Sequence, residues 1–337
     1  MVPHKLAIDK LARMGFPNWL TAWLYSYLTN RTGFVRVGGT HSRSFAMTSG
    51  VPQGSHLGPL IFILFVNDIC NRLHSQKLMY ADDLKVFRVV SSQIDCVALQ
   101  QDIEVIHEWC NINGMKVNER KCSVISFSKR QNTIHYRYVM NAYSLARVDS
   151  IKDLGVIMDH KLSFAKHVAT TTAKAFSMLG FLRRNTADFE NIHALKTLFI
   201  SMIRSILEYA VQVWAPHYAV QQDRLEKVQK SFTLYALRHL PWRNPAYLTS
   251  YVERRTLLQL ESLDQRRTLL QRLFVFDVIT NRIDCPGILQ RVNLHVPQRT
   301  LRNNVPLWIP HHFNAVWIFF DFNMSKELFK VRIRNVL

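Results

Sequence analysis

A loop rich in glycine and proline lies directly before the longest apolar run of the chain. The loop S-G-V-P-Q-G-S-H-L-G-P extends from Ser49 to Pro59, and the run L-I-F-I-L-F-V follows from Leu60 to Val66. Glycine lets a backbone approach a ligand closely, and proline is tolerated in the first turn of a helix. The sequence therefore predicts a shaped loop that leads into a helix beginning near Pro59. This apolar run is far shorter than the ~20 residues that a membrane span needs.

Two adjacent aspartates follow, in the segment K-L-M-Y-A-D-D-L-K-V-F-R-V-V. The β-forming residues on both sides predict two strands joined by a turn at Ala81 to Asp83. Aspartate in a turn usually serves the local backbone. Here a rigid hairpin would hold Asp82 and Asp83 with no local cation motif to pair them, and Mg²⁺ prefers hard carboxylate oxygens. Two adjacent aspartates are not a complete two-metal site, because neighbouring strand residues point to opposite faces and a third carboxylate normally joins them.

The charge of the chain indicates a polyanionic partner. The formal net charge is +19 and the pI is about 10.0, which favours binding to phosphates through counterion release. The cysteines are odd in number, widely spaced and without a C-x-x-C pair, which predicts free thiols in a reducing compartment. The N-terminal residues M-V-P-H-K-L-A-I-D-K contain no signal-peptide core. We therefore expect an intracellular, soluble protein.

Hydrophobic periodicity predicts an α+β first half and a helical second half. Expected in the first half are a helix carrying Trp19 and Trp23 in its core face and two short β segments around Gly38-Gly39. A helix over Gln93 to Cys110 should carry Ile94, Val97, Ala98, Val105 and Trp109 on one side, and strands are expected at Cys122 to Phe127 and Leu154 to Met158. After about Leu162, apolar residues recur at helical spacing, at Ile192, Leu195, Phe199, Met202 and Ile206 and again at Leu225, Val228, Phe232 and Tyr235. Trp242, Trp308 and Trp317 are interpreted as core residues.

The motifs, taken in order, carry a family resemblance. S-G-V-P-Q-G-S-x-L-G-P, then N-D-I at Asn67 to Ile69 and Y-A-D-D at Tyr80 to Asp83, resemble the palm of a reverse transcriptase of the non-LTR retrotransposon type, Jockey-like insect elements in particular. The resemblance continues through later segments, at Gly114 to Ile125, Leu154 to Asp159, Arg204 with Leu207 to Ala210, Trp214 to Pro216, and Leu225 to Lys230. It covers roughly residues 3 to 240.

The resemblance implies a role for each matching residue. Asp82 would be the main metal ligand and Asp83 a secondary one, for two Mg²⁺ ions with Mn²⁺ as an alternative. The nucleotide and template would contact further residues, namely Tyr80 near the primer end, Pro52, Gln53 and Gly54 around the templating base, and Lys121 near the phosphates. Leu154 and Gly155 would form the primer grip. The implied partners are an RNA template, a DNA primer and dNTPs, in the nucleus, the cytoplasm or both.

The resemblance also implies a domain order. A partial right-hand polymerase palm, an antiparallel sheet with helices, would occupy residues 1–160, a helical thumb 161–240, and a helical or irregular basic region 241–337. The first palm motif of the family, of the type A-F-D-x-V-x-H-x-x-L, supplies another catalytic aspartate. Here M-V-P-H-K-L matches only the part of that motif after its aspartate, and Asp9 lies in the next helix. We therefore expect an N-terminally truncated chain that lacks polymerase activity.

Other functions are weighed against this one. A domesticated or decayed copy would bind nucleic acid without chemistry, an RNA-templated RNA polymerase would carry G-D-D, and a group II intron maturase would share the palm but carry a Cys/His nuclease cluster. An unrelated α+β protein with a turn D-D is the plain alternative. The arginine pairs of the helical half predict either phosphate contacts or a solvated helix face; they are Arg183-Arg184, Arg254-Arg255 and Arg266-Arg267.

Overall fold

The chain forms two compact units of mixed helix and strand. A computed structural model describes residues 2–128, 134–238 and 250–290, and the backbone of a strand at 326–334. The first unit consists of Met1–Asp149 together with Asn323–Leu337, and the second of Ser150–Phe322. This confirms the mixed helix and strand class. The hairpin that begins at Ser150 is grouped with the second unit, before the predicted boundary at residue 160.

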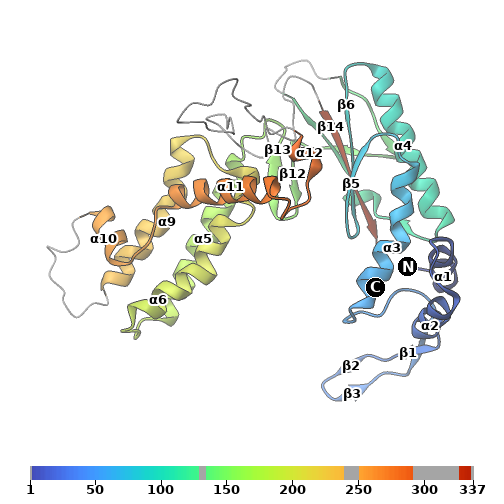
Figure 1. Cartoon of the computed structure of the whole chain (residues 1–337), viewed down its shortest axis with the longest axis horizontal. Helices are drawn as coiled ribbons and strands as arrows, with labels where there is room; N and C mark the ends of the chain where they lie inside the picture. The colour runs from blue at the N-terminus through green and yellow to red at the C-terminus, as the bar shows by residue number, and fades with distance from the viewer. Residues whose placement is uncertain (1, 129–133, 239–249, 291–325, 335–337) are drawn as a thin grey trace. The chain divides into compact units, whose positions relative to one another are not determined.

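The first unit packs helices against a sheet (Figure 1). Its helices are α1 (His4–Arg13), α2 (Asn18–Leu28), α3 (Leu57–Val66) and α4 (Gln93–Ile112), with 3₁₀ turns η1 (Asn67–Arg72) and η2 (Glu119–Lys121). Its strands are β1 (Arg31–Gly33), β2 (Arg36–Val37), β3 (Thr40–His41), β4 (Phe45–Met47), β5 (Gln76–Tyr80), β6 (Asp83–Val89), β7 (Lys116–Val117), β8 (Ser123–Phe127), β9 (Val139–Met140), β10 (Tyr143–Ser144), β11 (Ala146–Arg147) and β14 (Lys326–Arg334).

The C-terminal strand lies in the middle of the main sheet. The strand order is β11-β8-β14-β6-β5, and β14 also pairs with β7. β14 runs antiparallel to β6, from Lys326 opposite Val89 to Arg332 opposite Asp83, and antiparallel to β8 on its other side. β11 is parallel to β8, so the sheet is not wholly antiparallel. The prediction of only helical or irregular structure after residue 241 is wrong at this strand. The sequence carries the signal of a strand here, because apolar and basic residues alternate with a period of two from Phe329 to Arg334.

One face of the sheet is covered by α4 (Figure 1). The buried residues of α4 include Leu99, Ile103, Ile106 and Trp109, and they belong to the core that also holds Leu84 and Val86 of β6. The expected grouping of Ile94 and Val97 with Trp109 on one side of α4 is wrong, since Ile94 and Val97 are 79% and 42% exposed while Trp109 is fully buried. The sheet lies along the face of α4 that begins at Cys96, and Ile94 and Val97 project from another side.

The tryptophans of α2 are exposed, which corrects their interpretation as core. Trp19 is 72% and Trp23 53% exposed. The buried residues of this helix are Thr21, Leu24 and Leu28. Their spacing of three and four residues places them on one helix face, and the helix packs against α1.

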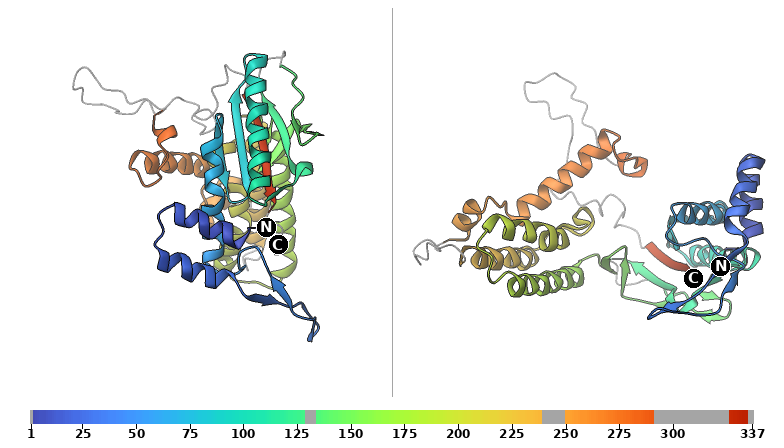
Figure 2. Two further views of the ribbon diagram at one scale, coloured as in Figure 1. Left: turned by 90° about the vertical axis from the view of Figure 1, so that its right-hand side faces the viewer. Right: turned by 90° about the horizontal axis from the view of Figure 1, so that it is seen from below.

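The second unit is a β-hairpin followed by helices. The hairpin is β12 (Ser150–Asp153) with β13 (Val156–Asp159), and the helical elements are α5 (Ala165–Asn185), α6 (Ile192–Leu198), the π-helix η3 (Phe199–Arg204), α7 (Ser205–Glu208), α8 (Val211–Trp214), α9 (Ala219–Arg238), α10 (Tyr251–Leu257), α11 (Leu263–Ile279) and α12 (Pro286–Leu289). α5 and α9 lie side by side (Figure 2). Trp242, Trp308 and Trp317 fall outside the described residues.

The π-helix changes which residues of its segment are buried. The predicted stripe continued from Phe199 to Met202 and Ile206, but the buried residues after Phe199 are Ile203 and Leu207. A π-helix closes each turn with an i→i+5 hydrogen bond. Its wider turn brings every fourth residue onto the same face, which places Ile203 and Leu207 in line with Phe199. Met202, three residues after Phe199, therefore lies beside the buried face and not in it.

Two findings bear on membrane spans and cysteines in the described part of the chain. None of its helices is long and apolar enough to cross a membrane. Its cysteines are free, although Cys70 and Cys285 are only half-buried.

Candidate active site

The predicted hairpin of the Y-A-D-D motif is confirmed. Tyr80 at the end of β5 pairs with Asp83 at the start of β6, so the turn consists of Ala81 and Asp82 alone. Ala81 has a φ of +51°, a conformation that costs a non-glycine residue free energy and that clusters at functional sites. The hairpin presents Asp82 at its tip, with the exposed Tyr80 ring beside it.

Both aspartates are half-buried. By strand alternation Lys85 projects from the same face of β6 as Asp83, and it is 7% exposed. Lys85 is thus the nearest basic residue on this strand to the two aspartates, two positions from Asp83. Among the described residues no group of three His, Cys, Asp or Glu side chains could hold a metal ion. The donor set fits Mg²⁺ in kind, since it offers hard carboxylate oxygens, but the described residues supply only part of it.

The glycine- and proline-rich loop is held by the residues at the start of α1. The His4 side chain makes a 2.9 Å hydrogen bond to the Gly50 carbonyl, and the Gly50 N–H donates to the carbonyl of Val2 at 2.8 Å. Gly58 is required by a close approach, because a Cβ there would lie 2.5 Å from the Pro52 carbonyl oxygen. Pro52 is buried, while Gln53 and Gly54 are exposed. The loop is thus a fixed structure that turns two of its three predicted site residues outward.

The aspartate of the N-D-I motif is used inside the fold. Asp68 accepts hydrogen bonds from the Lys10 ammonium at 2.8 Å and from the Trp109 indole N–H at 3.1 Å. Lys10 also donates to the Phe65 carbonyl. Burial lowers the pKa of Lys10, and Asp68 opposes that shift. Asp68 therefore connects α1, η1 and α4.

An acidic residue that holds the start of the β5–β6 hairpin was not found from the sequence. The fully buried Asp102 of α4 accepts hydrogen bonds from the backbone N–H groups of His74 and Ser75, at 2.8 and 2.9 Å. These residues lie directly before β5, so Asp102 anchors the strand that leads to Tyr80. The sequence did contain a signal for this role, because Asp102 lies between Leu99 and Ile103 on the apolar face of a helix. A carboxylate buried there is rare unless a partner binds it.

Lys121 lies at the end of η2 and is exposed. Its backbone N–H donates to the Asn118 carbonyl at 2.9 Å. η2 contacts the central strand β14. Lys121 is therefore carried by the same sheet system as the aspartate hairpin, on a different element.

The predicted primer-grip residues form the turn between β12 and β13 in the second unit. Leu154 has a φ of +42° and Gly155 of +88°. The Tyr209 hydroxyl donates to the Leu154 carbonyl at 2.9 Å, and a Cβ on Gly155 would lie 3.1 Å from the Tyr209 ring. The Trp214 indole in turn donates to the Tyr209 carbonyl at 2.7 Å. The turn is therefore held in a left-handed conformation by the helical part of its unit.

His167 holds the far strand of this hairpin. Its Nδ1 accepts a 3.2 Å hydrogen bond from the backbone N–H of Ile157, and its ring lies edge-on to Trp214 with centroids 4.8 Å apart. Burial lowers the pKa of His167 to about 4. It is therefore neutral at physiological pH and acts as an acceptor.

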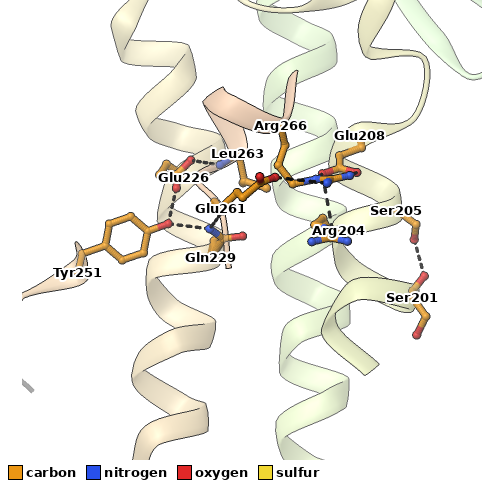
Figure 3. A network of polar contacts seen from close by, with 10 residues as sticks. All are labelled: Ser201, Arg204, Ser205, Glu208, Glu226, Gln229, Tyr251, Glu261, Leu263 and Arg266. Carbon is orange, nitrogen blue, oxygen red and sulfur yellow. Dashed lines mark hydrogen bonds and ion pairs between the residues drawn. The ribbon is translucent and has the colours of Figure 1, made fainter. Parts of the chain in front are cut away.

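At least one arginine of each predicted pair bonds inside the fold. Arg183 donates to Ser231, Arg254 is 8% exposed, and Arg267 is 4% exposed. Arg266 binds both carboxylate oxygens of Glu208, at 2.6 and 3.0 Å, as Figure 3 shows. One guanidinium group of each pair thus contacts another helix, through Arg183, Arg254 and Arg266, whereas Arg184 stays exposed.

Figure 3 shows how this contact extends into a network. Arg204 lies 3.6 Å from Glu208, and Arg266 also lies 3.5 Å from Glu261. Gln229 donates to the Tyr251 hydroxyl and to the Glu261 carbonyl, each at 2.9 Å. The network ties the π-helix segment, α9, α10 and α11 together.

The predicted site residues thus occupy different elements. Tyr80, Asp82 and Asp83 share one hairpin. Pro52, Gln53 and Gly54 lie in the loop before α3 and Lys121 in η2, within the same unit, whereas Leu154 and Gly155 belong to the second unit.

Known proteins with similar sequences identify the family. Residues 1–181 match the family model described as reverse transcriptase (RNA-dependent DNA polymerase). The chain is 27% identical over 238 residues to a probable RNA-directed DNA polymerase from transposon BS of Drosophila melanogaster, an alignment that covers 67% of this chain and 26% of that protein. It is 25% identical over 256 residues to the RNA-directed DNA polymerase from mobile element jockey of the same species, covering 71% and 27%.

A third similar protein comes from another insect. It is the Retrovirus-related Pol polyprotein from type-1 retrotransposable element R1 of Nasonia vitripennis, 28% identical over 144 residues, which cover 40% of this chain and 43% of that protein. The chain spans about a quarter of the length of the two Drosophila melanogaster proteins. With more than half of its residues matched by the family model, this chain belongs to the reverse transcriptases, among those of the non-LTR retrotransposons.

Proposed function

We propose that this chain is the palm and thumb portion of an RNA-directed DNA polymerase, and that it binds primed RNA template. The observation that carries the proposal is the hairpin of β5 and β6, whose two-residue turn holds Asp82 at its tip and Asp83 directly after it. Gln53, Gly54 and Lys121 would contact the nucleotide and template, with Leu154 and Gly155 against the primer. The net charge of +19 supports a polyanionic partner.

Asp82 and Asp83 would hold the divalent metal of this site, with Mg²⁺ the ion that their oxygens suit best. When bound, such an ion supplies charge stabilisation for phosphoryl transfer. Ala81, Asp102 and the β5–β6 pairing would keep the two carboxylates in place. We propose that the chain alone does not extend primers, since its described residues bring no third carboxylate to them.

Two assays on the purified chain separate the alternatives. Fluorescence anisotropy with a labelled DNA primer annealed to RNA should show binding that weakens as salt is raised. Extension of the same primer with dNTPs and Mg²⁺ or Mn²⁺ should give no product. A chain that binds neither primed template nor single-stranded RNA would contradict the proposal, and extension would contradict the claim that the site is incomplete.

A further inference from the structure

A hairpin arm of the first unit stands exposed on both faces. We define the arm as Arg31–Met47, which comprises β1 to β4. β1 pairs with β4 and β2 with β3, and every residue of the arm except Gly33 is exposed. The arm projects from α2, as the left view of Figure 2 shows. Side chains on it therefore meet solvent or a partner.

The exposed side chains of the arm are aromatic, aliphatic and basic. Phe34 and Phe45 are 54% and 53% exposed, and Val37 is 73% exposed. Soluble proteins rarely gather large exposed apolar side chains on one element without a binding role. A partner bound to this surface must offer apolar groups to the rings and negative charge to the basic side chains.

Every charged residue in and around the arm is positive. No Asp or Glu occurs between Asp9 and Asp68, whereas the arm carries Arg31, Arg36 and Arg43. Within the described structure, neither Arg36 nor Arg43 forms an ion pair. An acidic protein surface would satisfy the arginines but would not explain the aromatic rings between them.

The geometry of the arm suits an unpaired polynucleotide strand. Phe34 and His41 stack with ring centroids 4.6 Å apart and an interplanar angle of 16°. Arg36 lies directly opposite His41 across the strands, so these two side chains and the Phe34 ring that stacks on His41 lie on one side of the ribbon. Arg43 is exposed on the same arm. Proteins bind single strands by stacking bases on aromatic side chains beside a basic track for the phosphates.

We propose that the arm binds the unpaired RNA template strand, with a base stacked on the exposed Phe34 ring and phosphates paired with Arg36 and Arg43. The inference rests on the proposed function, because it specifies where the template strand outside the primed duplex is held. It adds a contact region that is separate from the aspartate hairpin. A duplex hides its base faces and would gain only the phosphate contacts.

The test compares affinities for a fluorescent single-stranded oligonucleotide and for a blunt RNA–DNA hybrid. Phe34→Ala should weaken single-strand binding by ~5-fold or more and hybrid binding much less, as the loss of one base stack requires. Arg36→Gln with Arg43→Gln should lower the salt slope of single-strand binding by about 1.4, since each neutralised phosphate contributes ~0.7. Tyr143→Ala is the control for Phe34→Ala, and the double variant Arg13→Gln with Arg72→Gln is the control for the two arginines of the arm. All three control residues are exposed and lie outside the arm.

The outcomes separate this inference from the proposed function. If the wild-type chain binds neither oligonucleotide, the proposed function fails and the inference with it. If the wild type binds but the arm variants, with unchanged circular dichroism, bind single strands as well as the controls do, the inference alone is overturned. Variants that keep their affinity but lose self-association would show that a second copy occupies the arm, which also overturns it.

Discussion

The hydroxyl of Tyr209 donates a 2.9 Å hydrogen bond to the carbonyl oxygen of Leu154, across 55 positions of the sequence. The bond connects the segment after α7 to the turn of the β12–β13 hairpin. That turn carries left-handed backbone at both of its central residues, Leu154 and Gly155. A leucine in this conformation needs external support, and Tyr209 provides it.

Tyr209→Phe should therefore destabilise the second unit by about 1 kcal/mol, the usual net value of one hydrogen bond. Amide hydrogen exchange should rise locally at Gly155 and Val156, because the turn loses its restraint. Tyr218→Phe is the control, since its ring is similarly exposed, 66% against 56% for Tyr209, and its hydroxyl forms no hydrogen bond within the described structure. Unchanged protection of the turn in Tyr209→Phe would contradict this role.

Lys10 and Asp68 are expected to respond unequally to mutation. Lys10 is the more buried partner, with 9% of its side chain exposed against 36% for Asp68. Asp68→Ala leaves a buried ammonium without its carboxylate and should cost about 3 kcal/mol. Lys10→Met removes the charge and keeps the packing, so urea denaturation should show a smaller loss. The reverse order would contradict the assignment of Asp68 as the partner of a buried cation.

Stability should depend on pH through His167. Its pKa of about 4 in the folded state lies below the ordinary histidine value of 6.5, so the unfolded chain binds the proton first. The contribution of His167 is therefore complete above pH 6.5 and is lost as pH falls toward 4, by roughly 2 to 3 kcal/mol. His167→Asn does not titrate there, and its denaturation midpoint should fall less steeply over this range. Parallel pH profiles for the two proteins would contradict a buried neutral His167.

Glu208 should contribute more to stability than its neighbour Glu261. Glu208→Gln leaves Arg204 and Arg266 near one another without the carboxylate that both contact, which should cost about 2 kcal/mol. Glu261 is the matched control, because its side chain is 58% exposed and an exposed ion pair contributes at most ~1 kcal/mol. Thermal denaturation of Glu208→Gln and Glu261→Gln measures the difference, and equal losses would contradict the central place of Glu208 in the network.

Local sequence signals and long-range contacts were not equally predictable. The β5–β6 hairpin, the Gly38-Gly39 turn and the end of α4 before Gly114 follow from turn residues and β-propensity, which act over a few positions. The exposed faces of Trp19 and Ile94 could not be predicted in the same way, because several helix faces are apolar and tertiary packing selects one. The role of Asp102 depends on backbone groups 27 and 28 positions earlier in the chain.

The central strand shows the same limit more sharply. β14 alternates apolar and basic residues, which indicates a strand, yet no local signal indicates that it lies between β6 and β8. Deletion of residues 323–337 should expose both strand edges. Hydrogen exchange of β6 and β8 should then accelerate while that of α5 and α9 stays unchanged. Unaltered protection of β6 would contradict the pairing.

The claim that Asp82 and Asp83 hold a divalent ion is tested most directly by Mn²⁺ binding to the whole chain, followed by electron paramagnetic resonance of the free ion. We expect Asp82→Asn to lower the affinity at least ~10-fold with an unchanged circular dichroism spectrum, and the exposed-site control Asp188→Asn to bind as the wild type does. Equal Mn²⁺ affinity in the wild type and in Asp82→Asn would contradict a metal-binding role for this hairpin.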